Sequence, residues 1–80
     1  MTEQKAWDAV RAAVAEVAPD VEPEDLVEDA RLRQDLELDS LDFLRVLETI
    51  AQLTGVDIPE GAYAEVGTVQ GLVGYVAAHG

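Results

Sequence analysis

The clearest structural signal in the chain is the stretch DSLDFLRVLETIAQL, residues 39–53. At about 100° per residue, its apolar side chains gather on one broad helical face, and these side chains are Phe43, Val46, Leu47, Ile50 and Leu53. Leu41 is the exception, because it projects among the polar residues and is free to contact a partner. We therefore predict an amphipathic helix that begins near Ser40 and ends at Thr54-Gly55, since glycine is favoured just past a helix end.

Two further helices are predicted, one on each side of this segment. Thr2 is placed to cap a first helix that runs to about Val17 and is stopped by Pro19. Thr68 is placed to cap a last helix, and a short helical piece is expected at residues 61–65. The apolar positions of the first helix are Trp7, Val10, Val14 and Val17, and those of the last are Val69, Leu72, Val73 and Val76.

The connection between the first two helices, residues 20–38, is long for a compact domain and must be pinned to it. Pro23 is positioned to start a short turn within it. The side chains expected to pin it are Leu26, Leu32, Leu36 and Leu38. In the last helix, Gly71 and Gly74 indicate either close approach of a neighbouring helix or a frayed C-terminus.

Together these elements predict an all-α fold. It is a small four-helix bundle, with three main helices, one short helix and a long first loop, in a single domain over residues 1–80. The chain contains no cysteine, so no disulfide or thiolate metal site supports its core. We expect it to be a monomer.

Charge limits the classes of partner. Seventeen acidic residues against five lysines and arginines give a formal net charge of −12. Nucleic acid and anionic membrane surfaces would repel such a molecule, so we expect partners with basic docking patches. No apolar run is long enough for a membrane span and no signal peptide is visible, which makes the cytoplasm the expected location.

No catalytic or metal-binding motif is complete. Asp35, Glu37 and Asp39 resemble the opening of a calcium loop, but Ser40 stands where glycine is needed and Val46 where the closing glutamate belongs. No Gly-x-Ser-x-Gly elbow surrounds the serine, and the only histidine lies next to the C-terminus. We therefore predict neither an enzyme active site nor a metal site.

What remains is a serine at the start of a helix. The first backbone N–H groups of a helix lack partners within it, and the helix dipole favours an anion there. Ser40 is thus suited to carry an attached phosphate group. The alternative is that Ser40, or Asp39 before it, is only an N-cap worth about 1 kcal/mol.

At this point the chain resembles the acyl carrier proteins, four-helix domains that bear phosphopantetheine. Three groups of residues, taken in order and spacing, carry the resemblance over nearly the whole chain. They are Leu32-x-x-Asp35-Leu36, Leu38-Asp39-Ser40-Leu41-Asp42 with the amphipathic helix after it, and Ile58-Pro59 followed by Thr68-Val69, Leu72, Tyr75 and Val76.

The resemblance implies that Ser40 receives 4′-phosphopantetheine from coenzyme A through a phosphopantetheinyl transferase, with Asp39 helping to hold the metal during transfer. The arm then carries acyl groups as thioesters. The implied partners are acyl-loading and acyl-transferring enzymes such as a ketosynthase, an acyltransferase or a ligase. The expected partner interface comprises Asp39, Leu41, Asp42, Arg45 and Glu48.

Two departures from the family pattern refine this expectation. Glu37 stands where many members have glycine, and Arg45, Ala51 and Gln52 lie on or near the face where fatty-acid carriers cluster acidic residues. The departure at Glu37 indicates a loop of different shape or charge, and the less acidic helix favours polyketide or other secondary-metabolite synthesis over general fatty acid synthesis. With only four aromatic residues, the core could also open a narrow cleft for an acyl chain.

Two alternatives stay open. A peptidyl or aminoacyl carrier protein is the nearest, although such domains more often have Gly-Gly-x-Ser or Gly-His-Ser before the helix than Leu38-Asp39-Ser40. The other is an unmodified acidic helical module that binds a basic partner.

Overall fold

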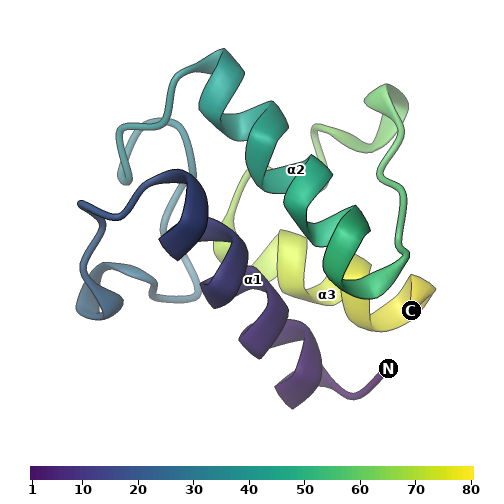
Figure 1. The fold of residues 1–80 in the computed structure, drawn as a ribbon. Helices are drawn as coiled ribbons and strands as arrows, with labels where there is room; N and C mark the ends of the chain where they lie inside the picture. Colours follow the sequence, from purple (N-terminus) through teal and green to yellow (C-terminus); the bar gives the residue numbers. More distant parts are fainter.

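The computed structural model describes all 80 residues and contains three α-helices and two short 3₁₀ turns. The helices are α1 (Glu3–Val17), α2 (Ser40–Thr54) and α3 (Val69–His79), and the turns span Pro23–Asp25 and Glu60–Ala62. Helix α1 packs against both α2 and α3, and the chain between α1 and α2 forms a long loop at one end of the molecule (Figure 1). The predicted all-α fold with a long first loop is confirmed, and the fourth, short element is a 3₁₀ turn.

Each helix begins at a side chain that accepts a hydrogen bond from a backbone N–H three residues further on. These caps are Thr2, Asp39 and Thr68, and such a cap stabilises a helix by about 1 kcal/mol. The predicted caps at Thr2 and Thr68 are confirmed. At α2 the cap is Asp39, and Ser40 is the first helical residue.

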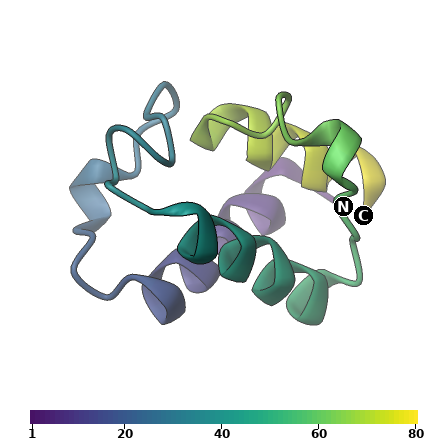
Figure 2. The ribbon, with the colours of Figure 1, turned by 90° about the horizontal axis from the view of Figure 1, so that it is seen from above.

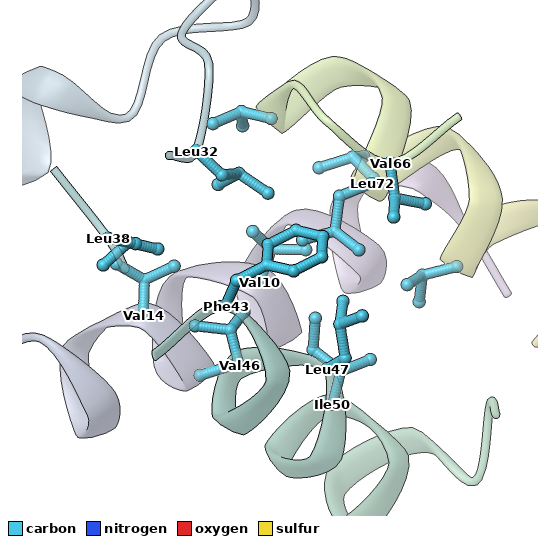
Figure 3. Close-up of a cluster of buried hydrophobic side chains, with 14 of the residues drawn as sticks. Val10, Val14, Leu32, Leu38, Phe43, Val46, Leu47, Ile50, Val66 and Leu72 are labelled. Carbon is cyan, nitrogen blue, oxygen red and sulfur yellow. The ribbon is translucent and has the colours of Figure 1, made fainter. Parts of the chain in front are cut away.

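Only apolar residues are buried, and eighteen of them form one continuous cluster between the helices and the long loop. The ring of Phe43 points from α2 into the middle of this cluster, toward the side chains of Leu32 and Leu72 (Figure 3). Val10 and Ile50 are fully buried in the same cluster. Branched aliphatic side chains therefore form most of the core.

The predicted burial of the apolar helix faces was wrong at a few positions. Leu53 is 54% exposed, although Ile50, one turn before it, is fully buried. On α1, Trp7 and Val17 are only half-buried, whereas Ala6 and Ala13 are fully buried. Helix α1 contacts two helices at once, and small side chains on the contact face let all three approach closely.

The long loop is fastened to the start of α3. The Leu32 N–H donates to the Gly67 carbonyl (3.0 Å), and the Val69 N–H donates to the Ala30 carbonyl (2.9 Å). Of the four leucines predicted to pin the loop, Leu26 is half-buried, and the three buried ones are Leu32, Leu36 and Leu38. The loop is therefore an ordered part of the core.

The two glycines of α3 differ. A Cβ atom at Gly71 would clash with the backbone carbonyl of Glu65, whereas one at Gly74 would meet nothing within 4 Å. Gly71 thus permits close approach, although of the preceding loop rather than of a helix. Helix α3 itself continues to His79.

The chain ends lie side by side at the end of the molecule away from the start of α2 (Figures 1 and 2). The N-terminal ammonium of Met1 donates to the carbonyls of Ala77 (3.2 Å) and Gly80 (2.7 Å). None of the helices has both the length and the apolar character that crossing a bilayer requires.

Candidate functional site

Ser40 lies at the N-terminus of α2 with its side chain exposed. The Asp39 carboxylate accepts a hydrogen bond from the Asp42 backbone N–H at 2.8 Å and so caps the helix. The Phe43 N–H donates to the Asp39 carbonyl as the first bond of the helical ladder. Capping therefore does not occupy the Ser40 hydroxyl, and the alternative in which Ser40 itself is the cap is wrong.

The turn before α2 is closed by one arginine–carboxylate pair. The Arg31 guanidinium donates two hydrogen bonds to the Asp35 carboxylate, both of 3.2 Å, and the Arg31 backbone N–H adds a third of 2.7 Å. The hydrogen bonds from Arg31 lower the pKa of Asp35 below its ordinary value, and in return Asp35 raises the pKa of Arg31. This pair fixes the shape of the turn between two buried leucines, Leu32 and Leu36.

At the tip of this turn, Arg33 points toward the serine. Its Nη2 donates a hydrogen bond to Ser40 Oγ at 3.1 Å, across seven residues of sequence. Both side chains are exposed. Sequence reasoning missed Arg33, because neither periodicity nor a motif indicates how a loop residue will point.

Glu37 has a φ of +58°, which makes it the one non-glycine residue in the left-handed region. A side chain in that region costs energy through contact of Cβ with the backbone, and glycine avoids this cost. A glycine at this position, as the resemblance leads us to expect, would adopt the same conformation without that cost. The departure at Glu37 thus leaves the turn in the glycine conformation and adds local strain.

A groove of about 440 Å³ opens beside Ser40, between α2 and residues 63–67. Its lining combines polar and apolar residues, which are Arg33, Gln34, Ser40, Phe43, Leu44, Tyr63, Ala64 and Gly67. The rings of Phe43 and Tyr63 meet edge to face at 5.7 Å. An exposed hydroxyl at the mouth of such a groove fits a phosphate-linked arm with an acyl or amide chain.

The other predicted interface residues lie along the exposed side of α2. Leu41 is 67% exposed, as predicted, and Arg45 and Glu48 are also exposed. Asp42 is half-buried, and its backbone N–H forms the cap contact. Leu44, 37% exposed, extends the apolar part of this surface. The predicted residues therefore share one accessible helix side next to Ser40.

Comparison with known proteins gives one family and several relatives. Residues 8–76 match a family model described as "Phosphopantetheine attachment site". An acyl carrier protein from Zymomonas mobilis is 37% identical over 59 residues, which cover 74% of this chain and 76% of that protein. Acyl carrier proteins from Thermosynechococcus vestitus (30% identical; 95% and 93% covered) and Cyanidioschyzon merolae (32%; 99% and 86%) are similar over nearly the full chain.

Proposed function

Because the chain belongs to the acyl carrier protein family, whose members bear 4′-phosphopantetheine and are carriers rather than catalysts, we propose that Ser40 is the residue that receives this group. When attached, the group supplies a flexible arm ending in a thiol that holds an acyl group as a thioester. The protein supplies the exposed attachment point and the surface that partner enzymes recognise. In this family those partners include a phosphopantetheinyl transferase and acyl-handling enzymes.

One observation supports Ser40 above all: its hydroxyl is exposed at the N-terminus of α2, and Asp39 has taken over the capping role. The Asp42 N–H is bonded to the Asp39 cap and the helical ladder begins at Phe43, which leaves the backbone N–H groups of Ser40 and Leu41 without a partner. A phosphodiester at Ser40 would lie beside these donors and near the positive end of the helix dipole.

Intact-mass spectrometry tests the assignment. The protein is incubated with coenzyme A, Mg²⁺ and a broad-specificity phosphopantetheinyl transferase. We expect wild type to gain the mass of one phosphopantetheine group and Ser40→Ala to gain none. If wild type gains no mass, the unmodified interaction module is favoured. If Ser40→Ala gains the mass, the group is attached to a residue other than Ser40.

Asp39 is proposed to help hold the metal during transfer, in addition to capping α2. The substitution Asp39→Asn separates these roles, because asparagine caps a helix about as well as aspartate but carries no charge. We expect an unchanged melting temperature together with slower modification. If wild type and Asp39→Asn are modified at equal rates, the role of Asp39 is only to cap α2.

For the cargo, we propose polyketide or other secondary-metabolite synthesis rather than general fatty acid synthesis. The exposed side of α2 carries Arg45 and Gln52 beside Glu48, so it is less acidic than the surface read by fatty acid synthase partners. Arg45 forms no ion pair that would neutralise it. A partner selected for an acidic helix would meet a like charge close to the arm.

The test measures acyl transfer from the loaded protein to a ketosynthase of a housekeeping fatty acid synthase. We expect a low rate with wild type and a higher rate with Arg45→Glu. Lys5→Glu is the matched control, since it changes net charge equally on exposed α1. Equal rates for wild type and Arg45→Glu, or a high rate with wild type, would contradict this assignment.

We also propose that the acyl chain enters the groove lined by Phe43, Leu44 and Tyr63. The groove adjoins Ser40, and these three residues give it an apolar surface. Loading acyl chains of increasing length should then shift the NMR signals of these residues progressively. If these NMR signals do not change with the length of the acyl chain, the acyl chain lies in solvent and not in the groove.

A further inference from the structure

The cationic side chain nearest to Ser40 belongs to Arg33, and its environment is unusual for so acidic a protein. The structure contains two ion pairs, Arg11 with Asp8 and Arg31 with Asp35. Arg33 has no carboxylate partner, although the chain carries seventeen acidic residues. Its guanidinium instead donates to a neutral hydroxyl, Ser40 Oγ, at 3.1 Å.

The backbone position of Arg33 is fixed by its neighbours. Leu32 on one side is fully buried and bonded to the Gly67 carbonyl, and Leu36 is buried further along. The Arg31–Asp35 pair closes the turn around it. The turn therefore presents the Arg33 side chain toward α2.

Attachment of a phosphate at Ser40 changes what Arg33 can bind. A phosphodiester replaces the hydroxyl proton with a group that carries one negative charge and two non-bridging oxygens. Guanidinium offers five N–H donors in a planar fork that matches such oxygens, and charged hydrogen bonds of this kind are stronger than neutral ones. In this structure only one of these donors has a partner.

We propose that Arg33 binds the phosphodiester on Ser40, an inference that rests on Ser40 being the attachment residue. Arg33 and Ser40 both line the groove that continues to Tyr63 and Gly67. An ion pair at its mouth would hold the phosphate toward the long loop and direct the arm into the groove. Arg33 is then a positioning residue that sets how often the arm is docked and how often it swings free.

The experiment uses the modified protein and does not depend on an acyl-handling enzyme. Wild type, Arg33→Gln, Arg33→Lys and the charge-matched control Lys5→Gln are converted with coenzyme A, and intact mass confirms each product. The ³¹P resonance of the phosphodiester and the ¹H–¹⁵N signals of the arginine side chains are then recorded.

The expected result has three parts. Modification of wild type shifts the side-chain N–H signals of Arg33 and leaves those of Arg11 in place. The ³¹P resonance moves in Arg33→Gln, moves part of the way in Arg33→Lys and stays in Lys5→Gln. Raising salt to about 1 M, where screening acts over about 3 Å, moves the wild-type ³¹P resonance toward that of the glutamine variant.

The possible failures are distinguishable. If wild type gains no mass, both the attachment at Ser40 and the contact with Arg33 are overturned. If wild type is modified but its Arg33 signals do not change and its ³¹P resonance ignores salt, only the contact is overturned. The wild-type measurements decide the question even if Arg33→Gln proves a poor transferase substrate.

Discussion

Replacing Glu37 by glycine should make this protein more stable. Glu37 has a φ of +58°, and its exposed side chain forms no hydrogen bond or ion pair that the change would remove. A left-handed conformation costs a residue with a Cβ atom about 1–2 kcal/mol. Glycine avoids this cost but gives up about 0.5–1 kcal/mol of chain entropy on folding. With values near the middle of both ranges, the net gain is about 0.5–1 kcal/mol.

For a domain of this size, a gain of about 0.5–1 kcal/mol raises the melting temperature by about 2–8 °C. Thermal unfolding followed by circular dichroism measures the shift, and urea unfolding gives the free energy directly. The unmodified protein is the appropriate sample, so that an attached arm contributes nothing.

Two controls separate backbone strain from charge. Glu37→Gln removes the same negative charge and keeps the strain, so it should raise the melting temperature less than Glu37→Gly. Gly55→Ala is the reverse experiment, because Gly55 has a φ of +77° with nothing within 4 Å of an added Cβ. It should cost about 1 kcal/mol. Equal gains from glutamine and glycine at position 37, or no gain from glycine, would refute the argument from strain.

Three further predictions concern stability. In urea unfolding, Gly74→Ala should raise the free energy of unfolding by up to about 1 kcal/mol. Gly71→Ala should lower it, because the added Cβ would meet the Glu65 carbonyl. Similar effects of the two substitutions would contradict the close approach of the Glu65 backbone to Gly71. Because its folded pKa is depressed, Asp35 stabilises the fold above its unfolded pKa of about 3.9, and this contribution is lost as pH falls through the folded value. Asp35→Asn should therefore lower the melting temperature at pH 7 but not in strong acid, and a constant difference across pH would count against the pair with Arg31. Finally, moderate NaCl or Mg²⁺ should raise the melting temperature by screening the net charge of −12, and an unresponsive melt would mean that self-repulsion is weak.

The helices were predictable because their signals are local. Thr2 and Thr68 are cap residues directly before apolar repeats, and the apolar spacing from Phe43 to Ile50 matches the helical period. The structure confirms these caps and buries that face. Caps and helical periodicity can be predicted from sequence because each depends on residues only a few positions apart.

The errors occur where a residue's environment depends on distant elements. Leu53 continues the apolar repeat of α2, but its side chain is 54% exposed because no other part of the chain covers it. Ala6 and Ala13 looked unremarkable in sequence and became fully buried because α1 lies against two helices. The helical repeat predicts on which face of the helix a side chain lies, but its burial depends on which other elements pack against that face.

The candidate site divides in the same way. Ser40 and Asp39 were identifiable from a helix start and a motif, and the structure divides their roles by making Asp39 the cap. Arg33 and Tyr63 were not identifiable as neighbours of the serine, because a loop conformation brings the first there and the chain after α2 brings the second. Contacts of this kind depend on tertiary structure.

The pairing of Met1 with Ala77 and Gly80 has a consequence for engineering. A short peptide linker could join the two ends into a ring, and new ends could be opened at an exposed loop position without separating α1 from α3. A fluorescent label or a fused module added at either end would project from the pole opposite α2's first turn. Such additions would leave the approach of large enzymes to Ser40 unobstructed.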